Sequence, residues 1–406
     1  MIAAKRALSL TLLAASLHSN AKDNNEHINS NQQQADKART IKPVSEAVRT
    51  NNDWTKNIRI SGLVQADARY FNGDNIASVD TFLIRRARIN VQGKVTDDIS
   101  FRIMPEFSDG NDGRLLDAYI DWKTGSNSSW RVGKFKLPIG LERVRSAANQ
   151  AFIEHGLTDN LVPNRDVGVA WNFKDKHNQL TVGIGNNAGD RQDTAIDTDD
   201  GKALFARAYW QPKALAGLGI GLAGSINNAS QNTSLPNYRT SSRATVFRFT
   251  NGVLRDGTES RIAPHFTWFS GSMGAFGEYI VSKTELNNNL GQRAALRNSS
   301  WQLVGSWLLS GEQNNWSGIT PAAANGAWEL VARIAALDID DDVFVFHSDL
   351  NTSVSKADAV AIGLNWHANR RVKVLVNYEI TRFTGGAAND DREDEKLLSA
   401  RLQLTY

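Results

Sequence analysis

The sequence predicts an all-β fold, a 16-stranded antiparallel transmembrane β-barrel with one long loop folded inward to form a constriction. Segments of roughly ten residues alternate between apolar and polar side chains from Ile58 to the end of the chain. The connections between them alternate between short and long, and the final segment, LLSARLQLTY, ends on an aromatic residue. This arrangement is typical of a bacterial outer-membrane barrel, because closure leaves no unpaired backbone group in lipid.

Composition excludes several other classes of protein. The chain has 406 residues, 41% of them hydrophobic, yet no apolar run is long enough to cross a bilayer as a helix. No nucleic-acid partner is expected, since 44 basic residues face 43 acidic ones once Lys5 and Arg6 are left out. The absence of cysteine is compatible with export and rules out disulfide scaffolds and thiol chemistry.

The first 57 residues are predicted to lie outside the barrel. The basic start MIAAKR is followed by the apolar ALSLTLLAASL and the small-residue end HSNA, which is the pattern of a cleavable export signal over 1–21. A helical core element is the alternative, but nothing after Ala21 continues the apolar pattern. Residues 22–57 are rich in Asn, Gln, Lys and Glu, which predicts a solvated periplasmic extension before the barrel at 58–406.

The first two strands carry the clearest alternation. From Ile58 to Tyr70 every second residue is apolar or small, and Arg59 and Arg69 lie on the other face. The stretch FLIRRARINVQGK places Arg86, Arg88 and Lys94 together on one face of the second strand. Further candidates start near Ile99, Leu116, Trp130, Val167, Gln179, Ala203, Gly217, Ala244, Ser260, Met273, Ser300, Gly326, Ala359, Arg371 and Leu397.

These seventeen candidates are one too many, since a closed barrel with both termini on one side needs an even number of strands. Connections alternate between long (72–81, 108–114, 137–166, 186–202) and short (96–98, 124–129, 174–178, 212–216), and the candidate at 244–250 breaks that order. Treating 226–259 as one long loop restores the order and leaves sixteen strands. The connection 310–325 is an exception, because it is long where a short one is expected.

A soluble β-sandwich or propeller is the rival architecture. About sixteen consecutive meander strands exceed what a sandwich uses, and the chain has no blade-length repeat. Tryptophans near strand ends or on apolar faces favour membrane girdles over a soluble core. They are Trp122, Trp130, Trp171, Trp210, Trp301, Trp307, Trp328 and Trp366.

The polar faces of the sixteen strands carry an excess of positive charge, with twelve basic residues against seven acidic ones. A narrow channel with low-dielectric walls amplifies such an excess and favours anions. The alternative is a solvated wall whose charges are paired and which selects little. The basic set includes Arg59, Arg69, Arg86, Arg88, Lys94 and Arg102.

Enzymatic and metal-binding motifs are weak. Gly219, Gly221 and Gly224 form a GxGxxG inside a strand, whereas a dinucleotide site needs a turn that opens a helix. No histidine pair has the spacing of a metal site, and the acidic run DIDDD at 338–342 is followed by Val343 where a calcium loop needs Gly. A serine near His265, at Ser270 or Ser272, is the only local hydrolase pair. We therefore predict no catalytic residues, no metal and no cofactor.

Several long stretches resemble the phosphate-selective porin O/P family, in the same order and over nearly all of 58–406. They are SGLVQADARYF, FLIRRARINVQGKV, LLDAYIDW, WRVGKFKLPIGLERVRS, NRDVGVAW, WLLSGEQ, GAWELVARIAALDIDDD, IGLNWHANRRVKVLVNYE and RLQLTY. The resemblance implies a homotrimer of sixteen-stranded barrels in which the third long loop, here 137–166, narrows the channel. It also implies that the long 310–325 connection is a family feature.

The resemblance assigns roles to particular residues. Members selective for phosphate use basic residues and a nearby Asp at the constriction, and these positions fall on Arg85, Arg86, Asp117 and Arg143. Two family arginines are not matched, since Leu63 and His155 stand near their positions. Strict alternation places Arg85 on the apolar face, and only a bulge or a loosened strand end would turn it inward.

The function expected from these patterns is an outer-membrane porin for passive diffusion of small anions, with phosphate or related oxyanions favoured. Arg86, Arg88 and neighbouring bases would replace part of an anion's hydration by charge-assisted hydrogen bonds. The expected partners are these anions, outer-membrane lipid and two further copies of the chain. The alternatives are a barrel that acts as an anchor or adhesin through its long loops and a barrel hydrolase.

Overall fold

The computed structural model describes residues 57–72, 79–108, 113–191 and 200–406. The predicted export signal, 1–21, and the predicted extension, 22–57 except for its last residue, lie outside these ranges and stay predictions. The unit Trp54–Tyr406 contains every described strand. No helix among the described residues has the length and apolarity needed to cross a bilayer.

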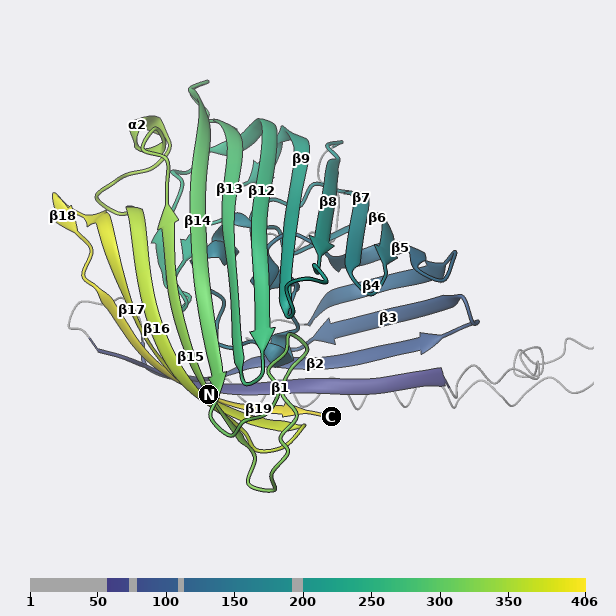
Figure 1. Ribbon diagram of the computed structural model, residues 1–406. Coiled ribbons are helices and arrows are strands. Elements are labelled where there is room, and N and C mark those ends of the chain that lie inside the picture. The colour runs from purple at the N-terminus through teal and green to yellow at the C-terminus, as the bar shows by residue number, and fades with distance from the viewer. Residues whose placement is uncertain (1–56, 73–78, 109–112, 192–199) are drawn as a thin grey trace, which may run out of the picture. The chain divides into compact units, whose positions relative to one another are not determined.

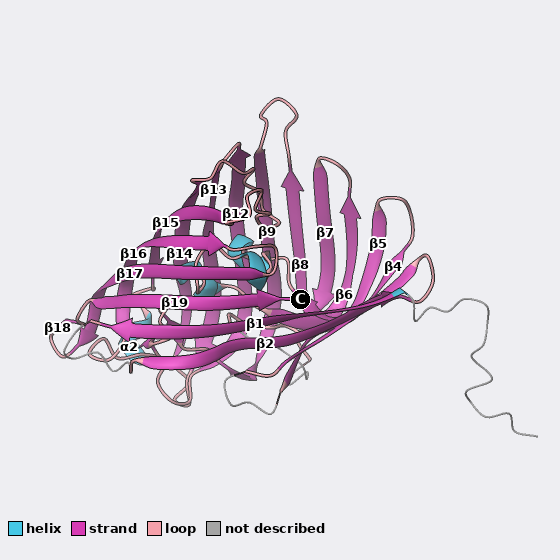
Figure 2. Cartoon of the chain, turned by 90° about the horizontal axis from the view of Figure 1, so that it is seen from below, coloured by secondary structure: helices cyan, strands magenta, loops and turns pink. Residues whose placement is uncertain are grey.

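Sixteen strands of the described residues form one closed antiparallel sheet (Figure 1). Each strand pairs with its neighbours along the chain, and β1 pairs with β19 from Leu63 opposite Thr405 to Phe71 opposite Leu397, which closes the barrel (Figure 2). The predicted strand count is confirmed. The strands are β1 (Ile58–Phe71), β2 (Thr81–Lys94), β3 (Ile99–Glu106), β4 (Arg114–Lys123), β5 (Ser128–Lys136), β6 (Arg165–Lys174), β7 (Asn178–Gly185), β8 (Ala203–Trp210), β9 (Leu218–Ser234), β12 (Leu254–Ser270), β13 (Met273–Asn287), β14 (Arg293–Leu308), β15 (Ala327–Asp338), β16 (Val354–His367), β17 (Val372–Ala387) and β19 (Glu395–Thr405).

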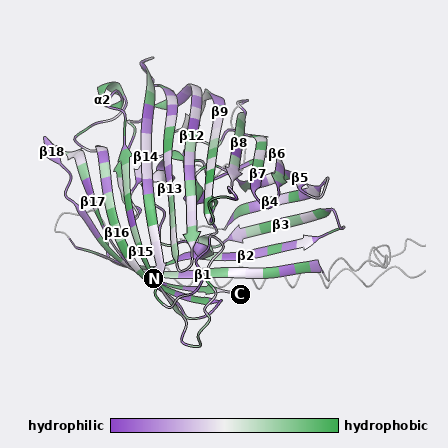
Figure 3. Ribbon diagram, in the orientation of Figure 1, coloured by the Kyte–Doolittle hydropathy of each residue, from purple (hydrophilic) through white to green (hydrophobic). Residues whose placement is uncertain are grey.

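The two-residue period of the sequence becomes the two faces of the wall (Figure 3). In β16 the outward side chains of Val360 and Ile362 are each 58% exposed, whereas the inward Ala359 and Ala361 are buried. A slip of one residue in register would turn every apolar side chain inward, so the alternation fixes the pairing of each strand. The exposed apolar face is the surface that contacts lipid.

The two rims of the barrel differ. One rim, called here the short-turn rim, holds the start of β1, the end of β19 and the turns 95–98, 124–127, 175–177, 211–217, 271–272 and 368–371. Connection 309–326, predicted as the long exception, also lies at this rim. The opposite, long-loop rim holds the inward loop 137–164 and the connections 186–202, 235–253 and 339–353, and also one short connection, 288–292.

The loop predicted over 226–259 is shorter than expected. Strand β9 continues to Ser234 and β12 starts at Leu254, so the loop covers 235–253. Inside it β10 (Tyr238–Arg239) pairs with β11 (Thr245–Phe247) as a separate two-stranded sheet. The candidate at 244–250 is therefore a strand of a loop hairpin and not part of the wall. In the same way, β18 (Asp390–Asp391) pairs only with the end of β17.

Tryptophans mark the short-turn rim. Eight of those in the described strands lie within three residues of the strand end at this rim, and cross-strand neighbours include Trp122 with Trp130 and Trp328 with Trp366. Trp301 lies farther from this rim, opposite Tyr279. Amphipathic rings at this level are typical of the boundary between hydrocarbon and water. The eight are Trp122, Trp130, Trp171, Trp210, Trp268, Trp307, Trp328 and Trp366.

The outer wall gives a first testable prediction. Replacing Ile362, which is 58% exposed near the middle of β16, by Arg should lower the free energy of unfolding by about 2–4 kcal/mol, because the charge would lie in hydrocarbon. Urea unfolding of protein folded into phospholipid vesicles measures this. The control Ile362→Val should cost less than about 1 kcal/mol. Equal values for the two variants would show that this face does not contact lipid.

Candidate functional site: a cationic cavity inside the barrel

The loop between β5 and β6 lies inside the barrel (Figure 2). It contains the short helix α1 (Leu141–Val144) and the 3-10 turns η2 (Ala147–Asn149) and η3 (Leu157–Leu161). Hydrogen bonds join it to inward side chains of β14, β16, β17 and β19, so the wall holds it along its length. The pairs are Gln302 with Glu142 (2.9 Å), Asn365 with Ala151 (2.9 Å), Asn377 with Ile153 (2.8 Å), Lys373 with Gln150 (2.9 Å) and Gln403 with Ala148 (2.9 Å).

Two other connections fill the same half of the barrel. The loop 235–253 reaches the wall through Ser241 and Ser242, whose hydroxyls donate to the carboxylates of Glu379 and Glu395. The connection 309–326 turns back into the barrel, where the Trp316 ring packs edge-on against Phe276. The carbonyl oxygen of Trp316 accepts a hydrogen bond of 3.2 Å from Arg145 of the inward loop. These contacts give a physical reason for the length of this connection.

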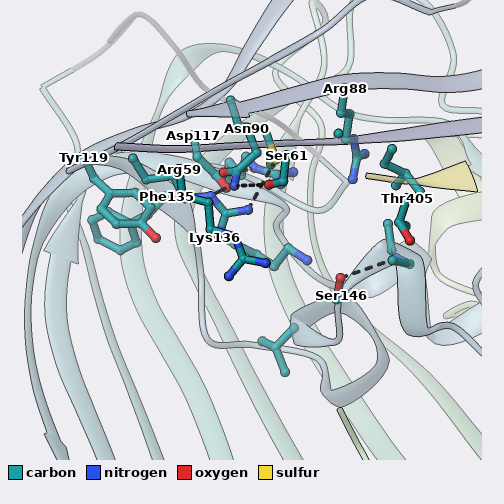
Figure 4. A pocket seen from close by; sticks show the side chains of 18 of the residues that line it. Arg59, Ser61, Arg88, Asn90, Asp117, Tyr119, Phe135, Lys136, Ser146 and Thr405 are labelled. Carbon is teal, nitrogen blue, oxygen red and sulfur yellow. Dashed lines mark hydrogen bonds and ion pairs between the residues drawn. The ribbon is translucent and has the colours of Figure 1, made fainter. Parts of the chain in front are cut away.

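A cavity of about 700 Å³ lies between the inward loop and the arc from β1 to β8 (Figure 4). Its lining contains nine basic residues and one acidic residue, Asp117. Figure 4 shows Arg59, Arg88 and Lys136 around this space. The basic residues are Arg59, Arg88, Arg102, Arg131, Lys136, Arg165, Arg207, Arg370 and Arg371.

Four of these cations are partly neutralised by carboxylates of neighbouring strands. The closest approaches are Arg88 to Glu106 (2.6 Å), Arg165 to Asp117 (2.7 Å), Arg102 to Asp117 (3.5 Å) and Arg131 to Asp121 (2.7 Å). Within the described residues the other five have no carboxylate within 4.0 Å. Lys136 donates instead to the carbonyl oxygen of Arg145 at 3.2 Å, and Arg207 to a ring nitrogen of His265 at 3.3 Å. The cavity therefore keeps a positive excess.

The structure separates the predicted site residues into three groups. Arg59, Arg88, Arg102 and Asp117 line the cavity. Lys94 is exposed where β2 ends at the short-turn rim. The others take part in buried contacts away from the cavity lining, and they are Arg69, Arg85, Arg86 and Arg143.

Arg85 lies at a β-bulge. Gln65 pairs with Arg86 and Ala66 with Ile84, so Arg85 has no partner in the register. The bulge turns its side chain inward, against strict alternation. There it forms an ion pair with Glu154 of the inward loop, which also accepts a bond of 2.9 Å from Arg69. A bulge is one of the two features that the sequence predicts could turn this residue inward.

Arg86 and Arg143 are also held by partners away from the cavity lining. Arg86 is 4% exposed and donates to the side-chain oxygen of Gln65 at 2.7 Å. Arg143 forms an ion pair of 2.5 Å with Asp159, which also bonds His155 at 2.8 Å. His155 thus sits beside a carboxylate of its own loop. These residues belong to the contacts that position the loop.

Sequence reasoning missed part of the cavity lining. Arg131 and Phe135 lie on one face of β5, and Trp130 lies on the other face. The alternation in this strand therefore could have placed Arg131 on the inner face. Arg165 and Lys136 lie at strand ends next to the inward loop, where alternation is difficult to follow. Arg370 and Arg371 lie in a turn, outside any strand face.

Burial and charge act in opposite directions on the loop carboxylates. Burial by itself raises the pKa of Glu154, but the charges of Arg85, Arg86 and Arg401 hold this pKa well below its usual value. Burial likewise opposes ionisation of Asp159, and Arg143 and His155 keep its pKa low. Both groups are ionised at neutral pH. The charged pairs of Glu154 attach the loop to the wall, whereas the pair of Asp159 with Arg143 lies within the loop.

A closed barrel with an apolar outer wall, an aromatic rim and a positively charged cavity inside is an outer-membrane porin, a channel and not an enzyme. Residues 58–406 match the family model described as "Phosphate-selective porin O and P". The chain belongs to this family.

The chain is also similar to individual proteins. The chain is 23% identical over 423 residues to "Porin O" of Pseudomonas aeruginosa, covering 89% of this chain and 90% of that protein. The structure of an anion-selective porin from Comamonas acidovorans matches with a TM-score of 0.57 and 12% identity, over 86% of this chain and 99% of that one. The trimer form of OmpT from Vibrio cholerae matches with a TM-score of 0.55 and 10% identity, over 86% and 99%.

The loop carboxylates give a second prediction. A carboxylate whose pKa is lowered by folding stabilises the protein above its unfolded pKa of about 4.3, and that contribution is lost as the pH falls from there toward the folded value. Acidification below about pH 4 should therefore loosen the loop around Glu154. Amide hydrogen exchange of segment 150–156 measures this.

Glu154→Gln is the matched variant for this test. The amide keeps the size of the side chain but removes its charge, so exchange in this segment should already be raised at pH 7 and change less with acid. If the wild type and the variant respond equally between pH 7 and pH 3.5, Glu154 does not hold the loop.

Proposed function

We propose that the barrel conducts small anions by passive diffusion, with phosphate and related oxyanions as favoured solutes. The inward loop 137–164 forms the constriction. The observation that carries this proposal is the cavity lining, in which nine basic residues face one acidic residue. In a space bounded by low-dielectric protein, such an excess attracts anions and repels cations.

The size of the cavity is compatible with a hydrated oxyanion. A volume of about 700 Å³ holds roughly twenty water molecules, since each occupies about 30 Å³ in the liquid. A solute can therefore keep much of its hydration while it exchanges some waters for guanidinium N–H groups. Contacts of this kind, repeated at successive arginines, bind weakly enough for release.

The basic residues take different roles in this proposal. Arg59, Arg370 and Arg371 lie at the short-turn rim and attract anions to that mouth. Arg88 and Asp117, with Arg102, form the anion-binding group beside the loop. We assign Arg69, Arg85, Arg86 and Arg143 to positioning the loop, because their partners are buried or half-buried and lie away from the cavity lining.

A homotrimer is part of the proposal. The structure of the outer membrane protein OmpT from Vibrio cholerae, which matches this fold, is described as a trimer form. Light scattering of the detergent-solubilised protein, corrected for detergent, tests this state: a mass of three chains supports it and a mass of one chain contradicts it.

Planar-bilayer conductance tests the transport role. The purified protein should give stepwise channels whose reversal potential in a KCl gradient indicates chloride preference, and phosphate should block the chloride current. Arg59→Gln combined with Arg207→Gln should lower the chloride-to-potassium permeability ratio by about two- to fivefold, because two cations without a carboxylate partner leave the lining.

The control for this experiment is Arg382→Gln. Arg382 lies on the outer face of β17, where its side chain is 77% exposed, and its removal should leave the permeability ratio unchanged. A protein without conductance steps would contradict the channel and favour an anchor. An equal effect of both changes would show that the lining cations do not set the selectivity.

A further inference from the structure

The outer face of β13 and β14 carries two cations directly opposite each other. Lys283 pairs in register with Arg297, and both side chains are exposed. Their chain neighbours Ser282 and Asn298 bond to Asp190 and Tyr238 inside the barrel, so Lys283 and Arg297 point outward. Neither side chain has a carboxylate within 4.0 Å among the described residues. Like charges directly opposite on a sheet destabilise it unless an anion lies between them.

A groove of about 290 Å³ surrounds the pair. Its lining includes Thr258 and Ser260 on the outer face of β12, which supply hydroxyl groups beside the two cations. The one acidic residue of this lining, Glu285, accepts a hydrogen bond of 2.9 Å from the backbone N–H of Thr258. Two cations and two hydroxyls around one groove suit an anion with several oxygen atoms, such as a phosphate group.

The level of the groove identifies the source of the phosphate. Lys283 is ten residues from the start of β13 at the short-turn rim, and Arg297 is eleven from the end of β14. At about 3.3 Å per residue and a strand tilt of about 40°, this is roughly 25 Å above the tryptophans of that rim, the height of the apolar band of an outer-membrane barrel. Counted from the short-turn rim, Lys283 and Arg297 are the first charged residues on the outer faces of β13 and β14. The exposed Trp301 and Tyr279 lie closer to that rim.

We infer that Lys283 and Arg297, with Thr258 and Ser260, bind the phosphate group of a phosphorylated lipid in the leaflet next to the long loops. A lipid presents its phosphate at this height, with its acyl chains beside the apolar side chains below. This explains why two cations that have no carboxylate partner among the described residues lie at the lipid boundary. Lys356 lies at a similar level on β16, but its ammonium is 3.4 Å from Asp358 and is therefore neutralised.

The experiment uses the full protein in nanodiscs of phosphatidylcholine and native mass spectrometry with lipid A, which carries two phosphates on a glucosamine disaccharide. The wild type should retain lipid A and bind its dephosphorylated form at least about tenfold more weakly. The double variant Lys283→Gln, Arg297→Gln should lose affinity for lipid A by roughly the same factor. The control Lys356→Gln, at the same level but already paired, should bind within about twofold of the wild type.

Three results would overturn the inference. The first is that the double variant, with its folding verified by circular dichroism, retains lipid A as well as the wild type does. The second is equal binding of the dephosphorylated lipid. The third is displacement of lipid A by an equal concentration of inorganic phosphate, which would make the groove a site for free anions. Because only lipid retention is measured, the result does not depend on whether the barrel conducts anions.

A second measurement uses the sign of a stability change. Lys283→Glu replaces the like-charge pair by an opposite-charge pair, so it should raise the melting temperature in an uncharged detergent. With lipid A present it should lower the melting temperature relative to the wild type, because a carboxylate then faces the phosphate. Stabilisation of equal size in both media would contradict the lipid site.

Discussion

Backbone hydrogen bonding in lipid is the constraint on which the rest of this structure depends. The hydrocarbon offers no partner for a free N–H or C=O group, so an open sheet of this size would leave two unpaired edges. The pairing of β1 with β19, separated by most of the chain, removes both edges. Closure also fixes the two faces, because an apolar outer face requires every second residue to point into a confined interior.

The confined interior explains the ion pairs. Arg401 and Asp67 form a bidentate pair at 2.6 and 2.7 Å, with side chains at most 1% exposed. A lone charge in this position would be costly, whereas paired charges with several hydrogen bonds are tolerated. Loops folded into the barrel supply many of the missing partners, as Glu154 does for Arg69 and Arg85. The buried arginines of the wall thus need the loop carboxylates as partners, and the same ion pairs hold the loops in place.

Much of the wall could be predicted from the sequence, because a period of two is local and repeats in every strand. The sixteen strands and the rejected segment at 244–250 follow from it, and so does the conflict at Arg85, which the structure resolves with a bulge. The partners of the basic residues could not be predicted. Glu154 lies 69 residues from Arg85, in a loop without periodicity, and only the folded chain brings the two together.

The distribution of acidic groups explains why one side of the interior remains cationic. Among the described residues, the loop acids Glu142, Glu154 and Asp159 approach arginines of β1, β2, β15, β19 and the loop itself. Among the described residues, the cavity cations that have a carboxylate within 4.0 Å pair with strand residues such as Glu106 and Asp117. The inward loop therefore neutralises the arginines that its acids contact and leaves a positive charge on the residues that line the cavity. The proposed anion selectivity therefore depends on where the loop lies as well as on how many arginines the chain contains.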